Sequence, residues 1–271
     1  MVRPILRAGQ KTQSPVIVQI SEKELIRYGI TPCEIAEEFY QAVEEENITV
    51  PVVLHLDHTK QLSIIEAAIE AGFTSIMIDA SEKELDENIK ISKEVVDFAH
   101  ARGVSVEAEL GKIGTTDFVE TDTDEELYTD PQEAWQFVNE TRCDALAVSV
   151  GTAHGVYHVR KPKIDLNRLK AIRNLTPVHL VLHGGSGVPA EMMREAIMIR
   201  NGGISKVNIA TDLELSLLEA IGRKNRMTNQ ECKALHQEQL VIGRNAVENT
   251  VIEKIEHFLG SSNKAKSFQL T

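Results

Sequence analysis

The stretch PVVLHLDH, residues 51–58, sets the pattern on which this chain is built. An apolar, β-branched run typical of a buried strand is closed by two polar residues, Asp57 and His58. Similar short runs recur along the chain, and polar side chains gather at their downstream ends. The predicted strands span residues 15–21, 51–57, 75–80, 105–110, 145–150, 179–183 and 204–210.

Amphipathic stretches with helix start signals separate these runs. Thr31-Pro32 precedes a predicted helix over residues 34–46, and Asp130-Pro131 precedes one over residues 133–141. Alternating strands and helices predict parallel βαβ units. Strand starts lie about 24 to 40 residues apart, which fits one crossover helix per strand. We therefore predict one domain over residues 1–259 and a C-terminal tail over residues 260–271.

The position of the polar residues favours a barrel over an open sheet. Six consecutive predicted strands carry polar groups at their carboxyl ends. In an open, doubly wound sheet only the strands beside the switch point supply ligand groups, whereas many strand ends contribute in a barrel. The pattern predicts an α/β fold of the (β/α)8 TIM-barrel type, of which this chain contains seven recognisable strands.

Composition argues against several classes of ligand. The formal net charge is −12 and only 4% of residues are aromatic, which disfavours nucleic acid and an anionic membrane surface. No apolar run approaches the ~20 residues of a membrane span. Three scattered cysteines, Cys33, Cys143 and Cys232, indicate free thiols in a reducing compartment, so we expect a cytoplasmic protein.

Three histidines stand where a barrel would bring them together. His58, His154 and His183 each lie at or just beyond the carboxyl end of a predicted strand. Three imidazoles with an open position form the catalytic zinc arrangement. By contrast, His179 lies at the upstream end of its strand and is interpreted as structural. His55 is expected to be a buried hydrogen-bonding partner on the same side of its strand as the aspartate two residues later.

The acidic residues at the same strand ends allow two interpretations each. Asp57, beside His58, could exchange a proton with substrate, or could orient an imidazole that binds metal. Glu107 and Glu109 face the same side of one strand. Together with Asp79 they could hold a second metal ion, or they could complete an internal ion pair with a lysine.

Two adjacent loops have the character of an anion site. The segment GGSG, residues 184–187, and the segment NIAT, residues 208–211, each follow a strand and lead into a helix. Backbone N–H groups at such a helix start attract an anion, and the pair matches the phosphate position common in barrels. We therefore predict a phosphorylated substrate. The acidic run over residues 120–126 is either a solvated loop or a lid that delivers an acid.

Ordered motifs between residues 15 and 212 resemble the class II, zinc-dependent ketose-bisphosphate aldolases, with the closest similarity to the fructose- and tagatose-bisphosphate branch. The resemblance implies a (β/α)8 barrel, a homodimer or homotetramer, and cleavage of a ketose 1,6-bisphosphate into dihydroxyacetone phosphate and an aldehyde phosphate. The motifs are VLHLDH (53–58), GFTSIMID (72–79), VEAELG (106–111), YTDP (128–131), GTAHG (151–155), LHGGSG (182–187) and KVNIATD (206–212).

The same resemblance implies a role for each matched residue. His58, His154 and His183 would bind the catalytic zinc ion, and Asp57 would act as general acid and base. Asp79 and Glu109 match a second site for a metal or monovalent cation. The positions that would hold dihydroxyacetone phosphate are Gly155, Gly184, Ser186, Asn208, Ile209, Ala210 and Thr211.

The chain departs from the family pattern in three places. The glycine that usually follows Asp-His is Thr59 here, and it is followed by Lys60. The glycine that usually follows Met-Ile-Asp is Ala80. Residues 1–11 correspond to the end of the first barrel helix, so the first strand and most of that helix are expected to be absent. A late start of the reading frame and a shortened, inactive relative would both explain this. The alternatives to an aldolase are a catalytically silent barrel that binds a sugar phosphate and an accessory subunit of an aldolase. A zinc hydrolase that uses the same imidazoles is a third alternative.

Overall fold

The computed structural model describes residues 1–113, 127–155, 157 and 161–268. The chain divides into two compact units, which are treated separately. Unit 1 comprises Met1–Ser75 and Asp212–Thr271, and unit 2 comprises Ile76–Thr211.

Unit 1 is organised around two paired strands. β1 (Val16–Ser21) and β2 (Val52–Thr59) run in parallel, and their register places Ser21 opposite Asp57. The predicted N-terminal helix is present as α1 (Val2–Thr12), which precedes β1. The other helices are α2 (Glu22–Tyr28), α3 (Pro32–Glu45), α4 (Leu62–Glu70), α9 (Thr211–Ala220), α10 (Asn229–Lys233), α11 (Gln237–Glu253), the π-helix η2 (Lys254–Leu259) and the 3₁₀ helix η3 (Ala265–Phe268).

Part of the predicted tail completes the end of α1. The backbone N–H of Asn263 donates to the carbonyl of Thr12, and that of Ala265 donates to the carbonyl of Gln13, each at 2.9 Å. Carbonyls at a helix end have no partner within the helix. The segment after residue 260 therefore supplies hydrogen bonds that α1 cannot make by itself.

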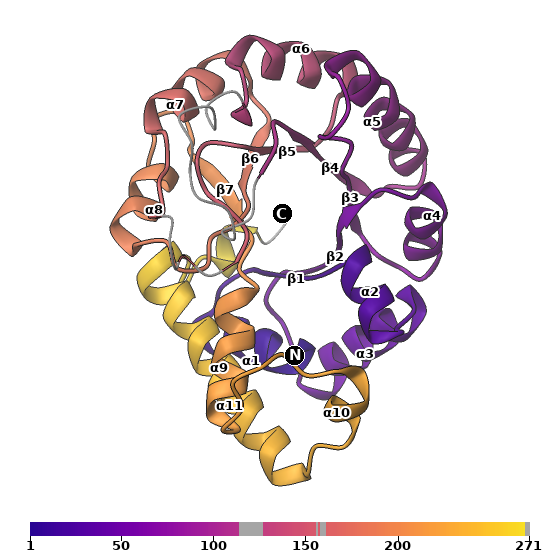
Figure 1. Ribbon diagram of the computed structural model, residues 1–271, viewed down its shortest axis with the longest axis vertical. Helices are drawn as coiled ribbons and strands as arrows, with labels where there is room; N and C mark the ends of the chain where they lie inside the picture. Colours follow the sequence, from indigo (N-terminus) through magenta and orange to yellow (C-terminus); the bar gives the residue numbers. More distant parts are fainter. Residues whose placement is uncertain (114–126, 156, 158–160, 269–271) are drawn as a thin grey trace. The chain divides into compact units, whose positions relative to one another are not determined.

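Unit 2 alternates strands with helices throughout. Its strands are β3 (Ser75–Ile78), β4 (Ser105–Leu110), β5 (Ala145–Val148), β6 (His179–Leu182) and β7 (Ile204–Val207). The β4–β5, β5–β6 and β6–β7 pairs are all parallel. Figure 1 shows the crossover helices as a row beside these strands: α5 (Leu85–His100), α6 (Pro131–Thr141), α7 (Leu166–Leu175) and α8 (Ala190–Ile197).

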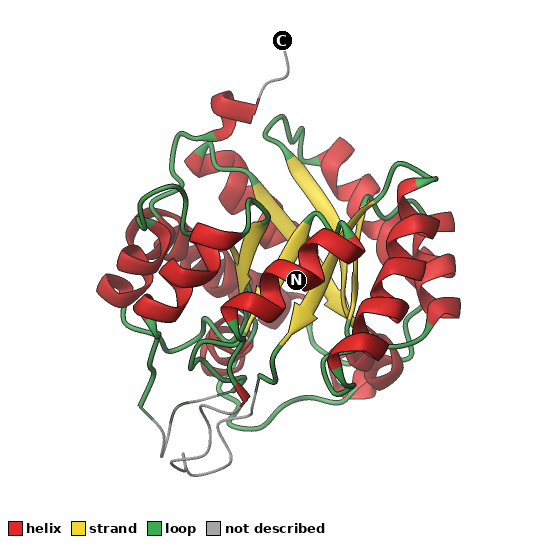
Figure 2. Ribbon diagram, turned by 90° about the horizontal axis from the view of Figure 1, so that it is seen from above, coloured by secondary structure: helices red, strands yellow, loops and turns green. Residues whose placement is uncertain are grey.

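Local sequence signals explain where several helices begin. Thr31 and Glu34 form a capping box before α3, with Pro32 in the first turn. Asp130 accepts hydrogen bonds from Gln132 and Glu133 at the start of α6. These caps start the helices α3 and α6, which lead into β2 and β5. They help set the strand–helix alternation seen in Figure 2.

The predicted strands are confirmed, with some ends placed too far downstream. Within the described residues there are seven strands, ordered β1 to β7 as in the chain. Their alternation with helices agrees with a TIM-type barrel fold. The runs over 75–80, 145–150 and 204–210 leave the sheet two or three residues early. None of the helices in the described part of the chain is long and apolar enough to cross a membrane.

Candidate functional site

The end of β2 holds the predicted acid in unit 1. Asp57 is 7% exposed, and Gln19 of β1 donates from Nε2 to its Oδ2 at 3.3 Å. His55 Nε2 lies 3.9 Å from Asp57 Oδ1, while His55 Nδ1 is paired with Ser75 Oγ at 2.8 Å. The expectation that His55 is a buried hydrogen-bonding partner is confirmed. Asp57 is thus held at the strand end by a neighbouring strand.

His58 has an unusual backbone conformation. Its φ is +42°, in the left-handed region that non-glycine residues rarely adopt. An extended strand would place consecutive side chains on opposite faces. The positive φ breaks this alternation at His58, directly after Asp57. Such conformations gather at functional sites, where the surrounding structure must enforce them.

The residues after His58 are fixed by an acid that the sequence analysis did not single out. Glu22, the first residue of α2, is buried and accepts from the Lys60 backbone N–H at 2.7 Å and from Gln61 Nε2 at 2.5 Å. Thr59 is fully buried, and its hydroxyl donates to the Asp57 carbonyl at 3.3 Å. The replacements Thr59 and Lys60 are therefore built into a hydrogen-bonded turn. The capping box of Ser21 and Glu24, which starts α2 and so places Glu22, was the available sequence signal.

In unit 2, His183 follows β6 and is completely buried. Its Nε2 is hydrogen-bonded to Glu107 Oε1 at 2.8 Å, and Lys206 Nζ donates to Glu107 Oε2 at 2.7 Å. Of the two interpretations left open for Glu107, the internal ion pair with a lysine is confirmed. Thr152 Oγ1 donates to the His183 carbonyl at 2.7 Å, which fixes the backbone as well.

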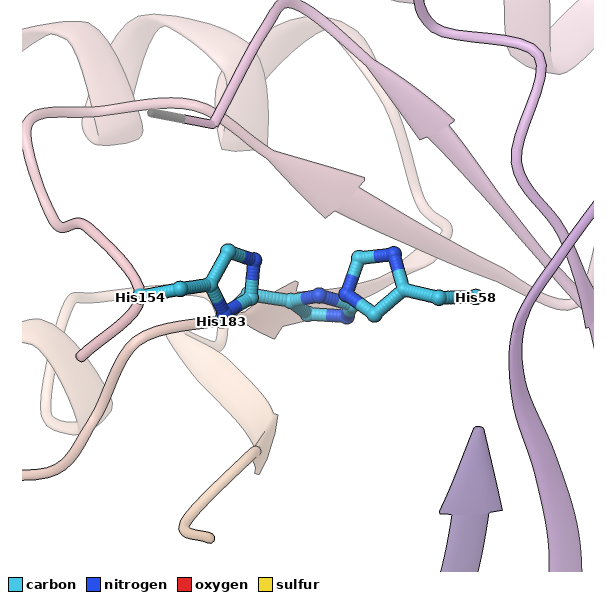
Figure 3. Close-up of side chains that lie close together, drawn as sticks. All are labelled: His58, His154 and His183. Atoms are coloured by element: carbon cyan, nitrogen blue, oxygen red, sulfur yellow. The ribbon is translucent and has the colours of Figure 1, made fainter. Parts of the chain in front are cut away.

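His154 lies beside His183 in the same unit. The two ring centroids are 5.7 Å apart with an interplanar angle of 71° (Figure 3). Tyr157 ties together the segments that carry them. Its hydroxyl accepts from the Ala153 N–H at 2.8 Å and donates to the Gly184 carbonyl at 3.5 Å. The strands place His183, whereas hydrogen bonds between loops place His154.

Replacing Tyr157 with Phe is expected to lower the free energy of unfolding by ~1–2 kcal/mol, because the buried Ala153 N–H loses its acceptor. Denaturant unfolding measures the change. The matched control is Tyr40→Phe, which removes a hydroxyl that donates to the Gly72 carbonyl at 2.6 Å from an exposed residue. Equal losses in the two variants would contradict the linking role of Tyr157.

The two predicted anion loops are hydrogen-bonded to each other. Gly185 N–H donates to the Asn208 carbonyl at 3.0 Å, and Asn208 N–H donates to the Leu182 carbonyl at 2.9 Å. Gly184 has φ +68°, and a Cβ atom there would lie 2.4 Å from the Ala153 carbonyl oxygen. No larger residue fits. Unit 2 therefore packs the loop that carries His154 against residues 184–187, which are in turn hydrogen-bonded to Asn208; the two loops, 184–187 and 208–211, are called the anion cradle.

The residues predicted for a second cation lie at neighbouring strand ends of unit 2. Asp79 Oδ1 accepts from Ser81 Oγ at 2.7 Å. Glu109 is 3% exposed, and its Oε2 lies 3.7 Å from His183 Nδ1. The acidic run over residues 120–126, predicted as a solvated loop or a lid, lies outside the described residues.

Unit 2 holds several side chains of the kinds that bind metal ions. His154 and His183 lie side by side there, and imidazole nitrogens suit zinc. Asp79 and Glu109 offer carboxylate oxygens in the same unit. Glu107 suits a metal least, because it is already engaged by His183 and Lys206.

The cysteines do not contribute a nucleophile. Cys33, Cys143 and Cys232 are free thiols, as predicted. Burial raises the pKa of the Cys143 thiol to about 12, so this group is neutral at physiological pH. The chemistry therefore rests on imidazoles, carboxylates and backbone N–H groups.

Comparison with known proteins shows the family to which this chain is similar. The family model for class II fructose-bisphosphate aldolase matches residues 1–264. A fructose-bisphosphate aldolase of Geobacillus stearothermophilus is 41% identical over 265 residues, covering 96% of this chain and 88% of the relative. One of Helicobacter pylori is 35% identical, covering 97% and 91% respectively.

Solved structures agree on the fold. The crystal structure of the YdjI aldolase from Escherichia coli K12 has a TM-score of 0.80 and 33% identity, covering 97% of this chain and 89% of that one. The fructose-bisphosphate aldolase of Campylobacter jejuni has a TM-score of 0.77 at 24% identity, covering 97% and 88%. At that identity the second likeness bears on the fold alone.

Proposed function

Since this chain belongs to the class II fructose-bisphosphate aldolase family, whose members are carbon–carbon lyases, we propose that it is a zinc-dependent ketose-bisphosphate aldolase. The reaction is the reversible cleavage of a ketose 1,6-bisphosphate of fructose or tagatose type. The products are dihydroxyacetone phosphate and an aldehyde phosphate. The observation that carries the proposal is the pair of imidazoles, His154 and His183, that unit 2 holds side by side.

The donor set fits zinc, as tested on the contacts within unit 2. His183 uses Nε2 for Glu107, so we assign Nδ1 to the metal. His154 lies next to it, and His58 would supply the third nitrogen. Zinc, when bound, supplies a positive charge that polarises a ketone carbonyl and offsets the negative charge that develops on its oxygen.

Asp57 is proposed as the general acid and base. In the cleavage direction its carboxylate takes the proton of the C4 hydroxyl while the C3–C4 bond breaks, and in the synthetic direction it returns that proton. The hydrogen bond from Gln19 orients the carboxylate for this transfer. The acid that exchanges a proton with C3 is proposed to come from the segment between residues 112 and 130.

Dihydroxyacetone phosphate is proposed to bind in the anion cradle. The glycines would allow a phosphate to approach the backbone closely. Helix α9 begins at Thr211, and the N–H groups at such a helix start attract an anion. Asp79 and Glu109 are proposed to hold a second metal or monovalent cation. The residues proposed to hold dihydroxyacetone phosphate are Gly155, Gly184, Ser186, Asn208, Ile209, Ala210 and Thr211.

Ser186→Glu is expected to weaken phosphate binding at least about tenfold, because it places a negative charge inside the cradle. The measurement is competition between substrate and inorganic phosphate. Ser186→Ala is the control, since it removes the hydroxyl without adding charge. If phosphate competes equally well with the Glu variant and with wild type, the phosphate binds elsewhere.

Three further properties complete the proposal. Residues 1–259 are proposed to act as one catalytic domain, with residues 260–271 as its C-terminal tail. The free cysteines and the metabolic role of the relatives support a cytoplasmic enzyme. A homodimer or homotetramer is proposed from the family resemblance.

The decisive assay offers fructose 1,6-bisphosphate, tagatose 1,6-bisphosphate and other C4 epimers, and detects both products before chelation, after chelation and after zinc is restored. Cleavage that disappears on chelation and returns with zinc supports the proposal. Release of inorganic phosphate without carbon–carbon cleavage would indicate a hydrolase. Phosphate-sugar binding without any turnover would indicate a silent barrel or an accessory subunit.

A further inference from the structure

Two charged residues outside the proposed ligand set, Glu107 and Lys206, form a chain of contacts that ends at the imidazole of His183. Glu107 on β4 is 2% exposed, and its two oxygens have different partners: Oε1 takes His183 Nε2 and Oε2 takes Lys206 Nζ. We propose that the Glu107–Lys206 pair positions His183 by fixing a proton on Nε2, so that Nδ1 presents its lone pair to the metal. This inference rests on the proposed zinc site.

The chemistry of the three groups dictates the direction of each hydrogen bond. A lysine ammonium only donates, and a carboxylate only accepts. Glu107, paired with Lys206, therefore stays an acceptor, and His183 must donate to it from Nε2. On the other side of the ring, Glu109 Oε2 lies 3.7 Å from Nδ1. Nε2 is thus the nitrogen whose proton is fixed.

The fold brings the three residues together from three strands. Glu107 lies opposite Ala145 in the β4–β5 register. A register shift between Leu180 and Val181 places Lys206 opposite Val181, two residues before His183. The Lys206 side chain is only 11% exposed, and its ammonium lies 2.7 Å from Glu107 Oε2. The pair also keeps Glu107 from acting as a ligand itself, because both carboxylate oxygens are in use.

Glu107→Gln tests the proposal because the side chain keeps its size, but its two acceptor oxygens are replaced by one acceptor oxygen and one donor NH₂ group. Lys206 requires an acceptor, so the amide oxygen turns toward it and the NH₂ group faces His183 Nε2. Nε2 must then accept, which moves the imidazole proton to Nδ1 and blocks the metal. We expect zinc affinity to fall at least about 10–100-fold, the range typical for loss of a partner behind a metal ligand.

Two further variants separate positioning from simple damage. Lys206→Met leaves the carboxylate as an acceptor for Nε2, so zinc affinity should stay within about tenfold of wild type. In the double variant Glu107→Gln with Lys206→Met, the amide is released to turn its oxygen toward His183, and zinc affinity should recover toward the Lys206→Met value. The control for a buried carboxylate elsewhere is Glu248→Gln, which weakens the contact with the exposed Lys11 in unit 1 and should leave zinc affinity unchanged.

Zinc affinity is measured by competition with a chelator, and ¹H–¹⁵N correlations of the zinc-loaded protein report which His183 nitrogen carries the proton. We expect a proton on Nε2 in wild type. A wild type that binds no zinc overturns the proposed function. A wild type that cleaves substrate with zinc but carries the proton on Nδ1, or a double variant no better than Glu107→Gln, overturns this inference alone. If Glu107→Gln does not fold, two measurements still test the inference. The wild-type spectrum should show the proton on Nε2 of His183, and the zinc affinity of Lys206→Met should stay within about tenfold of wild type.

Discussion

Replacing Asp57 with Asn is expected to lower kcat about 10²–10⁴-fold, the usual contribution of a general acid or base, with little change in the Kd of a substrate analogue. The amide retains the size of the carboxylate and can still accept from Gln19, but it cannot take a proton from the C4 hydroxyl. Turnover and analogue binding, measured on the same preparation, check this expectation.

Zinc content must be measured on that preparation too, because the substitution lies next to His58 and can alter its basicity. Asp165→Asn serves as control, since Asn caps α7 as well as Asp does and the site should be unaffected. A zinc-replete Asp57→Asn variant with full activity would rule out the proposed role. An inactive wild type that still binds the analogue would favour a silent barrel.

Replacing His183 with Ala is expected to cost more zinc affinity than the roughly 10–100-fold that follows loss of an outer partner, because a direct ligand is lost. Wild type should hold at least one zinc ion per chain, and the variant should lose it during dialysis against a mild chelator. Cleavage activity should fall with it. Metal analysis of the two dialysed proteins checks the expectation.

His179→Ala is the matched control for this variant. His179 is the first residue of β6, the strand that His183 follows. It is exposed, and its Nδ1 contacts Ser205 Oγ at 3.4 Å. Zinc retained by both alanine variants would remove His183 from the ligand set. Zinc lost from both would indicate damage to β6 rather than loss of a ligand.

The order of the elements could be predicted from the sequence because strand and helix have different hydrophobic periods. Strand ends were less accurate, since an apolar run does not reveal where pairing stops. The run over residues 204–210 leaves the sheet after Val207 for this reason. Helix α2 was missed because it has only seven residues, although its capping box at Ser21 was readable.

A strand end alone was enough to predict the place of His183, which directly follows β6. The predicted site was incomplete where side chains meet across long sequence separations. Glu107 and Lys206 are 99 residues apart, and a pattern of residue types cannot show which of several lysines reaches a given carboxylate. A lysine inside the short apolar run of β7 was the available hint, because a charge in such a strand requires a partner. Tyr157 gave no comparable signal.

The left-handed backbone at His58 lowers the stability of the fold for the sake of the imidazole at that position. A side chain held in this region costs roughly 1–3 kcal/mol, whereas glycine adopts it freely. Selection for folding alone would therefore replace this histidine with glycine, and only selection for what its imidazole does would keep it. The chain retains the costlier residue. A laboratory evolution experiment that rewarded thermal stability without catalysis would be expected to lose His58 early.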